Sequence, residues 1–297
     1  MTFFSVVIPT FNRSQLASRA IESVFNQTFS DFEVILVDDG STDDTKEVLL
    51  EKFSKDPRFK YIYQTNAKES AARNNGVMQS TGRFVCFLDS DDYYLSDHLA
   101  KLHERIKENG EALAFYHTLS YVEHENGERK KLQEEHQVES NPFYYLFRNQ
   151  ILPINICIPR EVAIKYPFRV DIYNDEDSEM FYRVVSDFPI VAIPEHTVVY
   201  FQHQGNSRDF YNKSSTYYLN RIQSTDIYLS NERIKSGFPE RFFETKKARN
   251  LEWAAVAALR EGKKKEAIAY MKQSESLLGK GAWSLKLLRF YFKALLS

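Results

Sequence analysis

The sequence predicts an α/β fold, with a doubly wound, mostly parallel sheet flanked by helices and a helical extension at the C-terminal end. Three observations predict it. Short apolar runs alternate with amphipathic stretches through residues 1–95, polar side chains follow each apolar run, and the pattern becomes wholly helical beyond about residue 206. Alternation of strand and helix specifies parallel strands joined by right-handed crossovers. We therefore expect one domain over residues 1–205 and a helical extension over 206–297.

The first half of the chain has the clearest pattern. Residues 3–8 form a β-branched and aromatic run that ends at Pro9, which is typical of a strand buried on both faces. Residues 14–25 carry apolar side chains at helical spacing. By the same criteria, strands are expected at 32–37, 59–63 and 84–88, and helices at 43–53 and 70–80.

The pattern beyond Tyr94 is weaker. It predicts a helix over 97–108, a strand over 112–118 and a charged hairpin or loop over 124–137. Near the end, Gly262 separates two helices expected at 245–261 and 264–278. A last helix over 281–297 would place basic residues opposite apolar ones. Such a helix either contacts an anionic membrane surface or packs against protein.

Composition excludes several classes of protein. The 39 Lys and Arg nearly balance the 41 Asp and Glu, so no positive field exists to collect nucleic acid, and none is expected as a partner. The two cysteines, Cys86 and Cys157, lack the spacing of a zinc site and favour a reducing compartment. No export signal or spanning apolar segment is recognisable. We expect a cytoplasmic protein, with peripheral contact to the inner face of the membrane as an option.

An acidic cluster, Asp89-Ser90-Asp91-Asp92, directly follows the strand expected at 84–88. In extended backbone the Asp89 and Asp91 side chains point to the same side, where two carboxylates repel each other unless a cation lies between them. Oxygen ligands suit magnesium or manganese, which keep phosphate oxygens and waters as further ligands. The alternative is a plain turn or helix cap.

A second acidic turn, Asp38-Asp39-Gly40-Ser41, follows the strand expected at 32–37. A carboxylate there can accept hydrogen bonds from a nucleoside, and Gly40 permits the tight turn. The first strand is followed by neither a G-x-G-x-x-G loop nor a Walker-type loop. The sequence therefore predicts a nucleotide whose phosphates are held by a metal ion.

The segments VVIPTFNR, NQTFSDFEVILVDDGSTDDT, ESAARNNGV and TGRFVCFLDSDD occur in this order along the chain. Together they resemble the family 2 glycosyltransferases of the GT-A fold, closely over residues 3–95 and more loosely to about 205. The resemblance implies inverting transfer of a sugar from a nucleoside-diphosphate sugar, with uridine as the expected base, to a glycan or lipid-linked acceptor. Residues 1–95 would bind the nucleotide and 96–205 the acceptor.

The resemblance also implies roles for individual residues. Asp89 and Asp91 correspond to the pair that binds metal and diphosphate, and His203 to a late histidine that can complete the metal shell. For His203 a surface or capping role is equally open. The expected nucleotide-binding residues are Pro9, Thr10, Phe11, Asn12, Asp39, Arg73 and Ser90.

The expected catalytic base lies in Asn174-Asp175-Glu176-Asp177. The resemblance assigns proton removal to Asp177 and orientation of acceptor hydroxyls to Glu176. Many relatives have Gly-Glu-Asp at this point, so the register is open by two residues and Asp175 is the fallback. Read without the resemblance, the cluster is an acidic helix start that complements the helix dipole.

Two other functions stay open. A nucleotidyltransferase would also use paired aspartates, but it should carry a Gly-rich, basic loop where this chain has Pro9 to Arg13. A catalytically silent module that binds sugar nucleotides is the second alternative. Self-association is a further option, and no motif specifies the sugar, the acceptor or the linkage.

Overall fold

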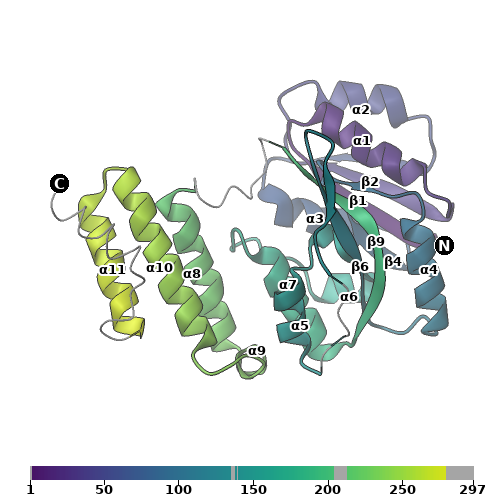
Figure 1. Cartoon of the computed structure of the whole chain (residues 1–297). Helices are drawn as coiled ribbons and strands as arrows, with labels where there is room; N and C mark the ends of the chain where they lie inside the picture. Colours follow the sequence, from purple (N-terminus) through teal and green to yellow (C-terminus); the bar gives the residue numbers. More distant parts are fainter. Residues whose placement is uncertain (1, 135–137, 139, 204–212, 279–297) are drawn as a thin grey trace. The chain divides into compact units, whose positions relative to one another are not determined.

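The computed structural model describes residues 2–134, 138, 140–203 and 213–278 (Figure 1). The chain divides into two compact units. The first contains residues 1–170 and 180–204, and the second contains 171–179 together with 205–297. A short segment in the middle of the sequence thus belongs to the same unit as the C-terminal helices.

The first unit holds the sheet and most of the helices. Its elements are β1 (Phe4–Thr10), α1 (Ser14–Phe25), β2 (Phe32–Asp38), α2 (Thr45–Phe53), β3 (Phe59–Tyr63), α3 (Lys68–Gln79), β4 (Phe84–Phe87), β5 (Tyr93–Tyr94), α4 (His98–Glu108), β6 (Phe115–His124), β7 (Arg129–Lys131), α5 (Pro142–Asn149), the 3-10 turn Pro153–Asn155, β8 (Ile156–Pro159), α6 (Arg160–Lys165), α7 (Glu176–Asp187), whose first turn belongs to the second unit, and β9 (Ile190–Gln202).

The strands form one sheet in the order β3-β2-β1-β4-β8-β6-β9-β5, with β7 paired to β6. Strands β1 to β4 pair in parallel, as predicted from the alternating pattern. In the second half, β8 is antiparallel to both β4 and β6, whereas β6 and β9 are parallel. The predicted α/β class with a flanked, doubly wound sheet is confirmed, and the half of the sheet that precedes Asp89 is wholly parallel.

Both faces of β1 are covered, which explains its continuous apolar sequence. On one face, Val6 and Ile8 belong to a core that includes Ala20 and Ile21 of α1. On the other face, α3 approaches so closely that a Cβ at Gly76 would lie 2.3 Å from Cγ1 of Val7. Burial of this kind fixes the register of the strands, and with it the position of the loops that follow them.

The described helices of the second unit are α8 (Ser215–Ser230), α9 (Glu232–Ser236), α10 (Phe242–Arg260) and α11 (Lys264–Leu278). Ala255 and Ala258 of α10 pack against Met271 of α11, and Gly262 between them has a φ of +75°, which glycine adopts readily. The predicted helical pair is therefore present. The helix predicted over 281–297 lies outside the described residues.

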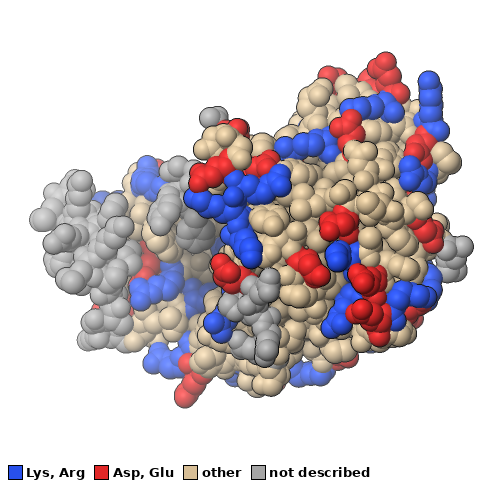
Figure 2. All heavy atoms as spheres, turned by 45° about the vertical axis from the view of Figure 1, so that its right-hand side comes forward, with Lys and Arg blue, Asp and Glu red and all other residues tan. Residues whose placement is uncertain are grey.

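The surface carries charges of both signs. Acidic and basic side chains are interspersed over the face in Figure 2, in keeping with a net charge of -2. In the described part of the chain, no helix combines the length and the apolar character needed to cross a membrane.

Candidate functional site

Three polar loops lie at one edge of the sheet, because they follow parallel strands that are direct neighbours. Thr10 at the end of β1 pairs with Asp38 at the end of β2, and the main-chain N–H of Asp39 donates to the Thr10 oxygen at 2.8 Å. Strand β4, on the other side of β1, runs into Asp89. Ligands bind at this carboxyl edge in open α/β sheets.

The loop after β1 is tied to the loop after β2. Asn12 has a φ of +51°, and its side-chain oxygen accepts from the N–H of Thr42 at 2.8 Å. Its own N–H donates to the Ser41 hydroxyl at 2.9 Å. Pro9 and Thr10 are buried, whereas the Phe11 side chain is exposed. Of the residues expected to bind a nucleoside, Phe11 and Asn12 are thus the accessible ones in this loop.

Asp39 is a buried carboxylate with several donors. It accepts from Nε2 of Gln64 and from the main-chain N–H groups of Ala67 and Lys68, each at 2.8 Å. A carboxylate has about four acceptor positions, so these bonds leave about one for a ligand. Asp39 therefore holds the start of α3 in place and retains limited capacity to accept a further hydrogen bond.

The two aspartates of the acidic cluster face different arginines. Nη2 of Arg73 lies 2.7 Å from Oδ1 of Asp89, and Nη1 of Arg13 lies 2.8 Å from Oδ2 of Asp91. Arg73 is buried below the Phe168 ring, 5.3 Å from its centre. The mutual repulsion predicted for the two carboxylates is thus offset by two guanidinium groups, which also suit diphosphate.

His203 lies beside the acidic cluster, although 112 positions separate it from Asp91 in the sequence. Its Nε2 is 3.2 Å from Oδ2 of Asp91, and both side chains are largely buried. The cluster is held against the end of β9, because Asp92 accepts from the N–H of Phe201 at 2.9 Å. Ser90 between the aspartates is buried.

A divalent cation fits this donor set in part. Asp91 and His203 offer an oxygen and a nitrogen side by side. Magnesium and manganese ions in proteins usually fill their remaining coordination positions with water and phosphate oxygens. Both carboxylates are also paired with arginine, Asp89 with Arg73 and Asp91, through the same Oδ2 that faces His203, with Arg13. Across residues 2–134, 138, 140–203 and 213–278, no group of three His, Cys, Asp or Glu side chains is placed to hold a metal.

Two arginines of this site were not predicted from the sequence. Arg13 directly follows the loop 9–12, so its place beside that motif was a usable signal. Arg19 lies on α1, and its Nη2 donates to the main-chain oxygen of Asp91 at 2.6 Å. Nothing in the helical spacing distinguishes Arg19 from an ordinary surface residue.

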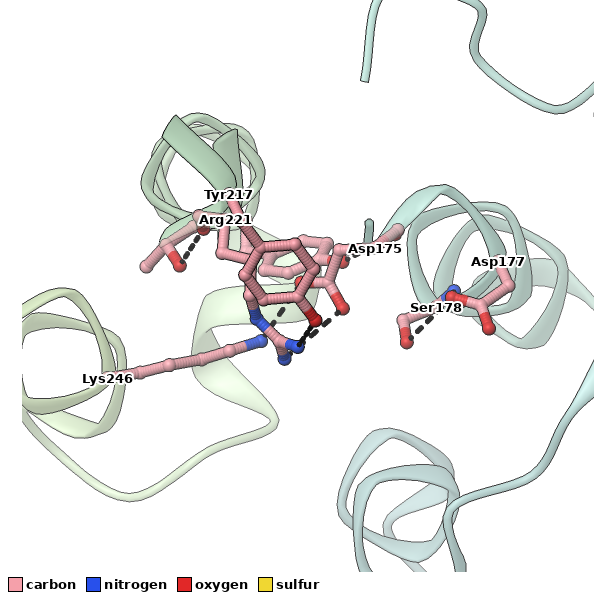
Figure 3. Close-up of polar contacts among 8 residues, drawn as sticks. Asp175, Asp177, Ser178, Tyr217, Arg221 and Lys246 are labelled. Carbon is pink, nitrogen blue, oxygen red and sulfur yellow. Dashed lines mark hydrogen bonds and ion pairs between the residues drawn. The ribbon is translucent and has the colours of Figure 1, made fainter. Parts of the chain in front are cut away.

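The candidate catalytic residues lie at the start of α7, in the second unit (Figure 3). Asp177 is partly buried, and its Oδ1 accepts from the N–H of Ser178 at 2.6 Å. Glu176 is also partly buried. Asp175 is buried and lies 3.1 Å from Nζ of Lys246. Burial alone would raise the pKa of Asp175, but the charges of Lys246 and Arg221 outweigh it and hold that pKa below its usual range.

The fold, with its polar loops at the carboxyl edge of the sheet, is that of an α/β protein of the glycosyltransferase type. The chain belongs to glycosyl transferase family 2, whose family model matches residues 5–166. It is 44% identical over 110 residues to GalNAc(5)-diNAcBac-PP-undecaprenol beta-1,3-glucosyltransferase of Campylobacter jejuni, and 36% identical over 121 residues to glycosyltransferase GlyA of Streptococcus pneumoniae. These matches cover 36% and 41% of this chain, but only 36% and 17% of the relatives.

Solved structures show the same fold. S. aureus TarS 1-349 in complex with UDP-GlcNAc has a TM-score of 0.61 at 20% identity, covering 99% of this chain and 79% of TarS. The mannosyltransferase PcManGT of Pyrobaculum calidifontis, in complex with GDP-Man and Mn2+, has a TM-score of 0.58 at 16% identity, covering 99% of this chain and 84% of PcManGT. The expected GT-A-type fold is confirmed.

Proposed function

We propose that this protein transfers a sugar from a nucleoside-diphosphate sugar to a hydroxyl group, with inversion at the anomeric carbon. One observation carries the proposal: Asp91 and His203 lie 3.2 Å apart at the carboxyl edge of the sheet. Arg13 and Arg73, each in contact with an aspartate of the same cluster, add positive charge where a diphosphate would lie. We further propose that residues 1–205 form the catalytic domain and 206–297 an extension.

The donor is proposed to be a UDP-sugar. Phe11 and Asn12 supply an exposed ring and an amide for the nucleoside, together with the remaining acceptor capacity of Asp39. The TarS and PcManGT structures are complexes with UDP-GlcNAc and GDP-Man, which supports a nucleotide sugar as donor. The remaining residues assigned to the nucleotide are Pro9, Thr10, Arg73 and Ser90.

A manganese or magnesium ion is proposed as cofactor. Asp91 and His203 would hold it once Arg13 turned from Asp91 to the diphosphate, and Asp89 would join them if Arg73 did the same. When bound, such an ion stabilises negative charge on the departing nucleoside diphosphate. Arg13 and Arg73 would remain beside the phosphates and would keep the leaving group oriented.

Asp177 is proposed as the general base. Its carboxylate takes the proton of the acceptor hydroxyl while that oxygen bonds to the anomeric carbon and the bond from this carbon to the phosphate oxygen breaks. Glu176 would orient the acceptor. Asp175 suits this role less well, because it is buried and its carboxylate is already paired with Lys246.

The acceptor is proposed to be a glycan or a lipid-linked saccharide. The name of the Campylobacter jejuni relative describes an undecaprenol-linked acceptor, which supports the lipid-linked choice. Such an acceptor would place the enzyme in polysaccharide synthesis at the cytoplasmic face of a membrane.

The test is a panel of nucleotide sugars incubated with the protein and Mn2+, with and without EDTA. We expect one donor to be hydrolysed or transferred, and EDTA to abolish the reaction. Asp177→Asn should lower kcat by about 100- to 10,000-fold, because it removes the base, while the Kd for the donor changes little. Release of pyrophosphate from a nucleoside triphosphate and a sugar phosphate would instead indicate a nucleotidyltransferase.

A further inference from the structure

The segment 171–179, which carries Asp177, is bonded to the C-terminal helices. Nζ of Lys246 on α10 lies 3.1 Å from the Asp175 carboxylate, and Nη2 of Arg221 on α8 lies 4.0 Å from its other oxygen (Figure 3). The Tyr228 hydroxyl, also on α8, donates to the main-chain oxygen of Asp175 at 3.3 Å. These four residues are called the Asp175 cluster below.

Because the Asp175 cluster is buried, it strongly constrains the position of the segment 171–179. The Asp175 side chain is only 7% exposed, so its charge depends on its partners for stabilisation. Removing one partner of a buried pair leaves an uncompensated charge and is strongly destabilising for that arrangement. A further bond, from Nε2 of Gln223 to the Asp171 main-chain oxygen at 3.2 Å, joins α8 to the start of the segment.

The backbone between these bonds and α7 is also restricted. Asn174 has a φ of +68°, a left-handed conformation that turns the chain just before the helix begins. Asp177 follows Asp175 by two residues, in the first turn of α7. Asp175 therefore lies directly before the helix turn that carries Asp177.

We propose that Lys246 and Arg221 are positioning residues, which fix the segment that carries the base by holding Asp175. The inference rests on the proposed role of Asp177 and gives the helical extension a part in catalysis. Neither residue is assigned contact with the substrate. Displacement of a catalytic group by about 1 Å can cost about a hundredfold in rate, so loss of this constraint should affect turnover more than donor binding.

The test compares Lys246→Met with Lys247→Met. Lys247 is the next residue of α10, but it pairs with the exposed Asp226 at 2.6 Å and so provides a matched control. We expect Lys246→Met to lower kcat by about 10- to 100-fold with the donor Kd within about twofold of the original. Lys246→Arg should restore most of kcat, and Lys247→Met should leave it unchanged.

Hydrogen exchange supplies a measurement that does not depend on activity. Amide groups of residues 171–179 should exchange faster in Lys246→Met and at the original rate in Lys247→Met. If Lys246→Met fails to fold, Tyr228→Phe removes one hydrogen bond of the cluster and should lower kcat by about two- to tenfold.

The outcomes separate this inference from the proposed function. Unchanged exchange in Lys246→Met would overturn the positioning role, whatever the activity. Faster exchange with unchanged kcat would overturn it as well, provided that Asp177→Asn is inactive. An active Asp177→Asn variant would instead contradict the assignment of the base, while the exchange data would still report on the Asp175 cluster.

Discussion

Nη2 of Arg19 donates to the main-chain oxygen of Asp91 at 2.6 Å, and the same guanidinium lies 4.0 Å from the centre of the Phe201 ring. It is also 5.0 Å from the ring centre of Tyr93. One side chain of α1 thus contacts both the acidic loop and the end of β9, from which His203 follows. Arg19 thus connects the loop that carries one proposed metal ligand to the strand end that precedes the other.

Replacing Arg19 by lysine should weaken nucleotide binding. Lysine keeps the charge but loses the planar group that stacks on Phe201 while it bonds to Asp91. We expect the Kd for UDP with Mn2+ to rise by about tenfold, equivalent to about 1.4 kcal/mol, measured by calorimetry. Arg58→Lys is a matched control, because Arg58 also lies over two rings, Phe25 and Phe32. Equal affinities for both variants would contradict this role of Arg19.

Gly76→Ala should destabilise the first unit. The added Cβ would lie 2.3 Å from Cγ1 of Val7, so α3 must move away from β1. Overpacking of this kind costs about 1–3 kcal/mol. Urea unfolding should show the loss, and Val7→Ala in the same chain should recover part of it. Met78→Ala, at an exposed position of the same helix, should have little effect. No recovery in the double variant would argue against the close contact.

Stability should fall as the pH drops below about 6.5. Burial lowers the pKa of His98 to about 3, whereas an unfolded chain binds this proton near pH 6.5. Between these values the unfolded state holds a proton that the folded state lacks, so acid favours unfolding. The expected loss from pH 7.5 to pH 5 is about 2 kcal/mol for this histidine.

The variant His98→Asn tests that pH dependence. Asparagine can keep the hydrogen bond that Nδ1 of His98 makes with the Thr197 hydroxyl at 2.8 Å, but it does not titrate. Urea unfolding at pH 7.5 and pH 5 should show a smaller loss in the variant by about 2 kcal/mol. Burial also lowers the pKa of His117, to about 4, so this histidine should contribute a similar loss of unfolding free energy in the variant and in the original protein. An equal loss in variant and original would contradict the assignment to His98.

The parallel half of the sheet could be predicted from the sequence because β1, β2 and β4 are buried and form apolar runs, and because β3, the partly buried edge strand, still carries aromatic and β-branched residues. The strands of the second half could not. Strand β5 has two residues, β8 ends in Pro159, and β9 contains Pro194 and alternates irregularly between buried and exposed positions. Their conformation depends on pairing with β6, which the local sequence does not encode.

Local motifs also predicted that Asp39, Asp89 and Asp91 follow the ends of neighbouring parallel strands, which the strand pairing bears out. Contacts between distant segments were not predictable. Arg19 bonds to Asp91 across 72 positions, and Lys246 bonds to Asp175 across 71. The nearness of His203 to Asp91 was suggested only by resemblance to the family. Side-chain pairs of this kind follow from tertiary packing, so periodicity and motif spacing contain no signal for them.

The most direct test of the central claim is calorimetric titration of UDP into the protein and into Asp91→Asn, each with and without Mn2+. We expect Mn2+ to strengthen UDP binding to the original protein by at least about tenfold, or 1.4 kcal/mol. Asp91→Asn should lose this gain, because it removes an oxygen ligand of the ion. UDP affinity that is the same in all four titrations would contradict a metal-assisted nucleotide site at Asp91 and His203.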